Sequence, residues 1–259
     1  MSREPMILVH GFSGTWEAWE PLLPALEREH DVLAVKLAGH CGGEDLPDPS
    51  TTALADAIER DMDRAGYETA HLVGNSLGGW MALELAKRGR ARSVVALSPG
   101  GGWEEDSREA KRVQAFFRRT YWSLKVGGPS ADFLARRPRL RRFALRDVMA
   151  RPERVPPRAA AAMIRGAAGC PAFLPLLKAI GRDGPPKDFR SIDVPIRIAW
   201  GTDDRILRYP AYWEPLRRIL PASAELVEMP GLGHVPMWDD PDLVARTVLE
   251  VTARRPVAA

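Results

Sequence analysis

Short apolar segments alternate with longer amphipathic segments along most of the chain. Segments of at most five residues that are rich in Val, Ile and Leu predict buried strands, and they lie at residues 6–10, 32–36, 70–74, 94–97, 196–200 and 225–229. Apolar residues spaced three and four apart predict helices over residues 16–28, 52–65, 77–87, 210–219 and 241–252. This alternation is typical of an α/β domain with a mostly parallel sheet.

The alternation stops between residues 101 and 190. Residues 159–164 and 172–180 have helical patterns, and a first helix is predicted by an apolar stripe at Val113, Phe116, Phe117, Tyr121 and Leu124. Prolines divide this segment into short helices. We therefore predict an α/β core of residues 1–100 and 191–259, with residues 101–190 inserted as a helical cap over the site. We interpret the stripe mainly as cap core, with part of it facing a pocket.

Ser76 lies between two glycines where a predicted strand meets a predicted helix, in the sequence Leu-Val-Gly-Asn-Ser-Leu-Gly-Gly at residues 72–79. A Gly-x-Ser-x-Gly at such a junction forces the serine into a strained conformation that exposes its hydroxyl. Glycine is required at Gly74 and Gly78 because a Cβ atom there would contact the neighbouring strand and helix. Ser76 is therefore a candidate nucleophile, and an ordinary tight turn is the alternative.

A nucleophilic serine needs a base, an acid that orients the base, and donors for the oxyanion. Downstream, the loop at residues 201–206 carries Asp203 and Asp204, and a later loop at residues 230–236 carries His234. Each lies just past a predicted strand, where an open parallel sheet gathers its ligand-binding groups. His234 is the candidate base. Either aspartate could be the acid, and the alternative role for each is a helix or turn cap.

These motifs together resemble those of α/β-hydrolases of the lidded esterase and carbon–carbon hydrolase type. The resemblance is carried by residues 8–12 (Leu-Val-His-Gly-Phe), 74–79, 201–206 and 233–236 (Gly-His-Val-Pro). It extends over about residues 6–100 and 194–251. The chain differs at residues 39–43, where Gly-His-Cys-Gly-Gly replaces the usual Gly-His-Gly-x-Ser, so this loop is expected to shape the pocket in its own way.

The resemblance implies roles for individual residues. It selects Asp204 as the acid of a triad with Ser76 and His234, because the family pattern is Gly-x-x-Asp. It implies that the backbone N–H groups of Phe12 and Leu77 form the oxyanion hole. It also implies six parallel strands, with the first lying between its two successors, because the chain starts too late for the extra hairpin of many relatives.

The resemblance also sorts the remaining histidines. His10 is implied to support the oxyanion loop and not to act as the base. We interpret His30, His40 and His71 as surface or strand-edge residues.

Composition limits the class of protein. With 259 residues and 45% hydrophobic content, the chain can bury one substantial core. Cys41 and Cys170 are too few for a disulfide framework, no apolar run approaches 18 residues, and residues 1–5 leave no room for a signal peptide. We therefore expect a cytoplasmic protein with no membrane span, no metal and no cofactor. No pattern predicts a particular oligomeric state.

Charge is unevenly distributed. Residues 101–190 contain 20 basic and 9 acidic residues, a net charge of +11, whereas the rest of the chain carries −8. No stacking platform or recognition module accompanies these charges, so they do not predict nucleic-acid binding. Two interpretations stay open: a solvated arginine-rich face, or a surface that attracts an anionic or carrier-bound acyl substrate.

Three functions are consistent with these sequence features. The leading hypothesis is hydrolysis of a carboxylic ester or thioester of a small-molecule acyl substrate through an acyl-enzyme. The second is carbon–carbon bond hydrolysis of a ketone-containing dienoate, and the third is a ligand receptor of the same fold without activity. Haloalkane dehalogenase and epoxide hydrolase chemistry is not expected, because those relatives have aspartate at the position of Ser76.

Overall fold

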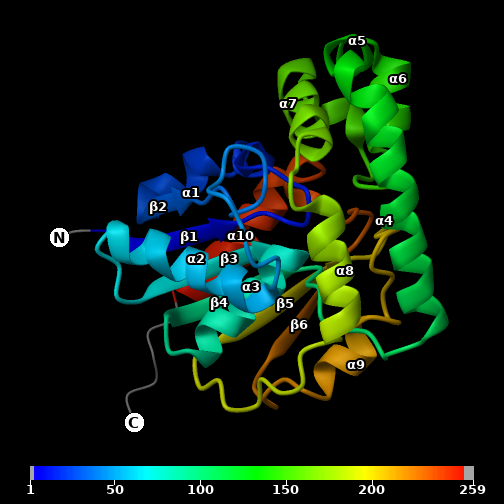
Figure 1. Ribbon diagram of the computed structural model, residues 1–259. Coiled ribbons are helices and arrows are strands. Elements are labelled where there is room, and N and C mark those ends of the chain that lie inside the picture. The colour runs from blue at the N-terminus through cyan, green and yellow to red at the C-terminus, as the bar shows by residue number, and fades with distance from the viewer. Residues whose placement is uncertain (1–2, 254–259) are drawn as a thin grey trace.

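A six-stranded parallel sheet forms the centre of the computed structural model, which describes residues 3–253 (Figure 1). The strand order is β2-β1-β3-β4-β5-β6. The strands are β1 (Glu4–Val9), β2 (His30–Ala34), β3 (Ala70–Asn75), β4 (Ala91–Leu97), β5 (Ile196–Gly201) and β6 (Glu225–Met229). The parallel pairing and the place of β1 between β2 and β3 confirm the predicted topology.

Helices cover both faces of the sheet, which is why its central strands are mostly apolar and largely buried. On β1, Ile7 and Val9 pack with helices α2 (Thr51–Arg64) and α3 (Leu77–Lys87). Met6 and Leu8 point to the opposite face and pack with η1 (Trp16–Trp19), α1 (Leu23–Glu29) and α10 (Pro241–Thr252). The period-2 alternation of a strand thus sends successive apolar side chains of β1 into two separate cores.

Two predicted helices are shorter or divided in the structure. The predicted helix at residues 16–28 is two helices, η1 and α1, with Pro21 between them and Pro24 in the first turn of α1. The predicted helix at residues 210–219 contracts to α9 (Trp213–Arg217), which has Pro215 in its first turn. Proline lacks the backbone N–H that a helix interior requires, so it is tolerated only near a helix start.

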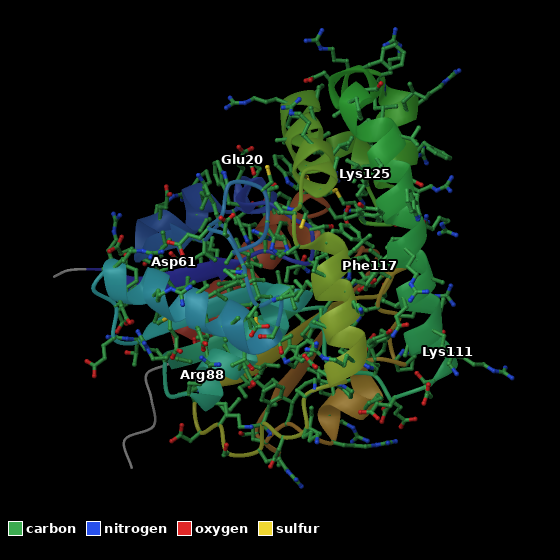
Figure 2. All side chains as sticks on the ribbon, viewed as in Figure 1. Glu20, Asp61, Arg88, Lys111, Phe117 and Lys125 are labelled. Carbon is green, nitrogen blue, oxygen red and sulfur yellow. The ribbon has the colours of Figure 1, made fainter. Side chains whose placement is uncertain are left out.

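The segment between β4 and β5 is helical, and we call residues 101–190 the helical insertion. Its elements are α4 (Arg108–Gly127), η2 (Gly128–Ser130), α5 (Ala131–Arg136), α6 (Pro138–Leu145), η3 (Pro152–Arg154), α7 (Pro157–Ala168) and α8 (Phe173–Asp183). Helices α4 and α8 lie near the sheet, whereas α5 and α6 extend farthest from it (Figure 1). Figure 2 shows Lys111 and Lys125 near the two ends of α4 and Phe117 between them on the side of α8.

Within residues 3–253, no single helix is long and apolar enough to cross a membrane. Helices α7 and α8 meet the criteria of length and composition only as a pair, and this pair is bent by 67°.

Candidate active site

Ser76 occupies a sharp turn between β3 and α3. Its φ of 57° and ψ of −119° lie in a region that residues other than glycine rarely adopt. A Cβ atom at Gly74 would lie 2.1 Å from the carbonyl oxygen of Gly78, and one at Gly78 would lie 2.1 Å from the carbonyl oxygen of Val9. The two glycines are therefore needed for this turn, as the sequence pattern predicts.

Backbone hydrogen bonds hold Ser76 in this strained conformation. Its N–H donates to Leu97 O at 2.9 Å, and its carbonyl oxygen accepts from Trp80 N at 3.1 Å and Gly100 N at 2.8 Å. Within the described part of the chain, its hydroxyl forms no hydrogen bond, and it lines two neighbouring cavities. The turn thus fixes the backbone of Ser76 and leaves its hydroxyl free at the two cavities.

His234 and Asp204 form a buried pair. The Nδ1–H of His234 donates to Asp204 Oδ2 at 2.7 Å, and the two side chains are 5% and 0% exposed. The second carboxylate oxygen, Oδ1, accepts from the backbone N–H groups of Ile206 and Leu207, both at 2.8 Å. The two backbone N–H groups hold the carboxylate in place. Because Nδ1 is bonded to this carboxylate, Nε2 is the ring nitrogen of His234 that stays available to a reacting group.

Asp203 is placed differently from its neighbour. It is exposed, its backbone N–H donates to Leu232 O at 2.9 Å, and its carboxylate forms no hydrogen bond among the described residues. The structure therefore brings Asp204, and not Asp203, to His234. The cap role considered for Asp203 is not seen.

Ser76 and His234 line the same cavity, but no hydrogen bond joins them among residues 3–253. A catalytic hydrogen bond of this kind is often long in a structure without substrate and shortens in the reacting complex. The arrangement brings Ser76, Asp204 and His234, the candidate nucleophile, acid and base, together from three loops that follow β3, β5 and β6.

Two residues that the sequence analysis missed hold the His234 loop. Asn75, which is buried beside the serine, donates through Nδ2 to Leu97 O at 3.0 Å and to His234 O at 2.8 Å. Asp239 is fully buried, and its carboxylate accepts from the N–H of Gly233 at 2.8 Å. No local pattern marks Asn75, because its partner lies 159 residues away.

Asp239 also binds the helical insertion. Its carboxylate accepts from the backbone N–H groups of Ala150 at 3.0 Å and Arg151 at 2.6 Å, and its carbonyl oxygen accepts from the side chains of Arg151 and Arg154. One carboxylate therefore connects residues 150 and 151 of the helical insertion to Gly233, the residue before His234. The adjacent Asp240 has the separate role of capping α10.

Two backbone N–H groups are available at Ser76. Phe12 and Leu77 line the cavity beside the serine, and their N–H groups have no acceptor in residues 3–253. Leu77 is the first residue of α3, where helix N–H groups lack intrahelical partners. These are the positions that the family resemblance implies for an oxyanion hole.

His10 supports the loop that carries Phe12. Its Nε2 accepts from Leu37 N at 3.2 Å, and its Nδ1–H donates to Gly11 O at 2.9 Å. Burial, and to a smaller extent the charge of neighbouring His40, lowers the pKa of His10 to about 3. A neutral, doubly hydrogen-bonded imidazole suits a structural role.

The expectation that three other histidines are surface or strand-edge residues is wrong with respect to burial. His30, His40 and His71 are all at least 94% buried. The ring of His30 bonds Thr252 Oγ1 at 2.9 Å, and that of His71 bonds Ser93 Oγ at 2.8 Å. Their partners come from distant strands and helices, so the sequence pattern around each histidine does not reveal its burial.

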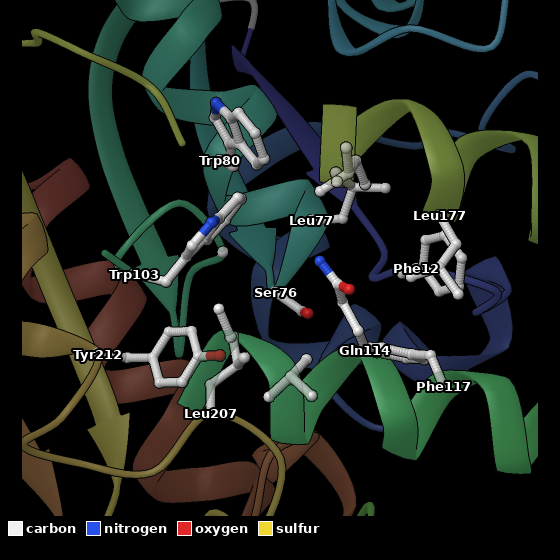
Figure 3. A pocket seen from close by; sticks show the side chains of 15 residues that line it. Phe12, Ser76, Leu77, Trp80, Trp103, Gln114, Phe117, Leu177, Leu207 and Tyr212 are labelled. Carbon is white, nitrogen blue, oxygen red and sulfur yellow. The ribbon is translucent and has the colours of Figure 1, made fainter. Parts of the chain in front are cut away.

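Two cavities meet at Ser76. The first chamber, of about 90 Å³, lies between α3, α4 and α8 and is lined by Leu77, Trp80, Trp103 and Gln114 among others (Figure 3). The second chamber, of about 150 Å³, extends toward α7 and includes His234. Ser76, Phe12 and Phe117 line both chambers.

Residues of the α4 stripe form walls of these chambers. Val113 and Phe117 line the first chamber, and Phe116, Phe117 and Leu124 line the second. The stripe therefore faces the pocket more than the interpretation as cap core expected. No Lys, Arg, Asp or Glu is among the residues that line either chamber. The interior is thus apolar, with a few polar groups close to the serine.

Comparison with known proteins agrees with this fold. The model of the α/β hydrolase family matches residues 6–247, so the chain belongs to this family. An epoxide hydrolase, EphH, of Mycobacterium tuberculosis is 36% identical over 200 residues, which cover 77% of this chain and 93% of that protein. These relationships identify the protein as a hydrolase.

Solved structures show the same fold at low sequence identity. An enol-lactonase from Burkholderia xenovorans aligns with a TM-score of 0.72 and 19% identity, covering 98% of this chain and 93% of that one. A 2-hydroxy-6-oxo-6-phenylhexa-2,4-dienoate hydrolase from Rhodococcus sp. aligns with a TM-score of 0.73 and 21% identity, covering 97% and 91%.

Proposed function

We propose that the protein hydrolyses a neutral carboxylic ester or thioester through Ser76, His234 and Asp204. The observation that carries this proposal is the strained Ser76 turn, which presents a hydroxyl to two apolar chambers, one of them shared with His234. An activated serine in a largely apolar site suits acyl transfer.

In the proposed mechanism, Ser76 Oγ attacks the carbonyl carbon while His234 Nε2 takes its proton. Asp204 holds the ring with Nδ1–H and stabilises the imidazolium. The N–H groups of Phe12 and Leu77 bind the tetrahedral oxyanion. When this intermediate collapses, His234 returns the proton to the departing alcohol or thiol. Water then attacks the acyl-enzyme with the same base, which releases the acid and restores Ser76.

The position of His234 assigns the chambers in this proposal. The base must reach the leaving group to protonate it, and His234 lines only the second chamber. We therefore place the alcohol or thiol in the second chamber and the acyl group in the first, beside Leu77 and Trp80. The helical insertion supplies walls for both groups through α4, which supports the proposal that it acts as a cap.

The name of the mycobacterial relative raises epoxide opening as an alternative. If Ser76 attacked an epoxide carbon, the product would be a serine ether. Water cannot release it by attacking a carbonyl, because an ether has none, so the enzyme would not turn over. This chemical difference favours a carbonyl substrate for a chain that has serine at position 76.

Carbon–carbon hydrolysis of a dienoate is the second alternative, because a structural neighbour is named for that reaction. A dienoate carries a carboxylate, whose burial without a partner is costly. The chambers have no Lys or Arg among their lining residues. The absence of Lys and Arg from the lining also argues against an anionic group inside the pocket. An anionic carrier attached to the substrate would have to lie outside the pocket. A receptor without activity would be distinguished by its lack of turnover.

A substrate panel tests the proposal. It would contain p-nitrophenyl esters of graded acyl length, acyl-CoA thioesters, a dienoate and a styrene-type epoxide, each assayed with wild type and Ser76→Ala. We expect turnover of neutral esters that depends on Ser76 and declines when the acyl chain outgrows the first chamber. Turnover of only the dienoate or the epoxide would contradict the proposal, as would ester turnover that survives in Ser76→Ala.

A further inference from the structure

A third hollow lies outside the active site, on the surface of the helical insertion. It has a volume of about 360 Å³ and is lined by four arginines, which are Arg139, Arg142, Arg146 and Arg205, together with Phe143 and residues 149, 150 and 152. We call it the arginine groove. No carboxylate is among its lining residues. Its walls come from α6, from the residues that follow α6, and from Arg205 in the loop after β5.

The helical repeat places this charge on one face. Arg139, Arg142, Phe143 and Arg146 follow the spacing i, i+3, i+4 and i+7, which aligns side chains along one side of a helix. Arg141, which breaks this spacing, is instead buried and donates to Ala135 O at 2.7 Å. The exposed face of α6 is therefore basic, and the opposite face packs into the insertion.

The charges of the groove are poorly compensated. Arg139 and Arg142 form no hydrogen bond or ion pair in the part of the chain that the structure describes. Among the described residues, the one carboxylate near the guanidinium of Arg146 is that of Asp147, at 4.0 Å between two exposed side chains, and Arg205 donates to the carbonyl oxygen of Arg146 at 3.1 Å. Like charges at this spacing destabilise a helix, so an unpaired arginine row is unfavourable without an anion.

Aromatic residues accompany the arginines. Phe143 is 64% exposed and lies under the guanidinium of Arg146, 4.1 Å from its ring centre. On α5, Phe133 is 51% exposed and lies 3.6 Å beneath Arg137. Stacking on a ring holds each guanidinium plane in place, which leaves its edge free for a forked pair of hydrogen bonds.

We propose that the arginine groove binds a phosphate-bearing group. Guanidinium groups recognise phosphate oxygens in pairs, and four of them around one hollow match a group with several oxygens and more than one negative charge. The group could belong to a soluble phosphorylated molecule or to the headgroup of an anionic phospholipid, and both present the same phosphate chemistry. The site is independent of the proposed ester hydrolysis, because none of its lining residues lines a chamber at Ser76.

Calorimetric titration with inorganic pyrophosphate at low ionic strength tests the groove. The test variant is R139Q/R142Q, and the matched control is R118Q/R158Q, which removes the same charge from exposed positions outside the groove. We expect the test variant to bind pyrophosphate at least about 10-fold more weakly than wild type, and the control to stay within about twofold. R139K/R142K, which keeps charge but loses the fork, should fall between wild type and the test variant.

Sedimentation with vesicles distinguishes the source of the phosphate. Binding to phosphatidylglycerol vesicles but not to phosphatidylcholine vesicles, lost in R139Q/R142Q, identifies a lipid headgroup; pyrophosphate binding without vesicle binding identifies a soluble ligand. Turnover of a neutral ester should be equal in all variants, which verifies folding. The proposal is overturned if wild type binds neither pyrophosphate nor anionic vesicles. Equal weakening in the test and control variants would also overturn it, because that reports net charge and not a site.

Discussion

The Nδ1 atom of His234 lies 2.7 Å from the Oδ2 atom of Asp204, and both side chains are buried. The carboxylate is itself fixed by two backbone N–H groups, from Ile206 and Leu207. Such a pair sets the tautomer of the imidazole, because the nitrogen facing the carboxylate keeps the proton. Nε2 is then left free to accept a proton, and in the proposed mechanism that proton comes from Ser76, which lines the same chamber.

The adjacent residues Asp203 and Asp204 allow the role of the His234–Asp204 pair to be tested within one loop. Asp204→Asn should lower kcat by about 10³–10⁴, because an amide can hold the imidazole in the wrong tautomer. Asp203→Asn removes an exposed carboxylate without a hydrogen bond and should change kcat by less than about threefold. Steady-state kinetics on one neutral ester measures both. Larger loss in the Asp203 variant would show that the acid is assigned to the wrong residue.

Asp239 should be important for stability as well as for the position of His234. In Asp239→Asn, the new amide NH2 group replaces either Oδ2, which accepts from the N–H groups of Gly233 and Ala150, or Oδ1, which accepts from that of Arg151, so at least one donor loses its acceptor. Each buried donor left unpaired costs about 1–3 kcal/mol, so urea unfolding should shift to a clearly lower midpoint. Asp240→Asn is the control, because asparagine also caps helices well. Matching midpoints for the two variants would refute this role of Asp239.

The chambers should separate acyl from alcohol specificity. Gly181→Leu adds a side chain to the wall of the first chamber, and Ala167→Leu does so in the second. The first variant should lower kcat/KM for long acyl chains at least about 10-fold while sparing acetyl esters. The second should act on bulky alcohols instead. A series of esters varied at one end and then at the other measures this, and the reverse pattern would exchange the two assignments.

Low pH should destabilise the protein through His10. Its pKa is about 3 in the fold, whereas a free histidine has a pKa of about 6.5, so between these values the unfolded chain binds more protons. The free energy of unfolding should therefore fall as pH decreases from 6.5 toward 3, by up to about 1.4 kcal/mol per pH unit for this group. Urea midpoints measured across this range should fall less steeply in His10→Gln. Parallel slopes in variant and wild type would exclude this contribution.

Local sequence was sufficient for the parts of the protein that local physics determines. The six strands follow from short apolar runs. The turn at Ser76 follows from the glycines at positions 74 and 78, where the neighbouring backbone leaves no room for a Cβ atom. The adjacent aspartates needed the family pattern to separate them, because both have the same local setting.

Other features depend on contacts between distant segments. Asn75 meets the backbone of His234 only after β3 and the loop after β6 are side by side, and Asp239 meets residues 150 and 151 across 88 or more positions. The burial of His30 and His71 likewise arises from packing between β1, β2, β3 and α10. No periodicity in one segment encodes such contacts.

Covalent labelling of Ser76 tests the central claim most directly. A fluorophosphonate probe reacts with a serine whose hydroxyl is activated by a neighbouring base, and intact-mass spectrometry with peptide mapping shows where it attaches. We predict a single adduct at Ser76, no labelling of Ser76→Ala, and strongly reduced labelling of His234→Ala, with turnover in Ser76→Ala lower by roughly 10⁴ or more. Equal labelling of wild type and Ser76→Ala, or an adduct at another residue, would contradict the assignment of Ser76 as the nucleophile.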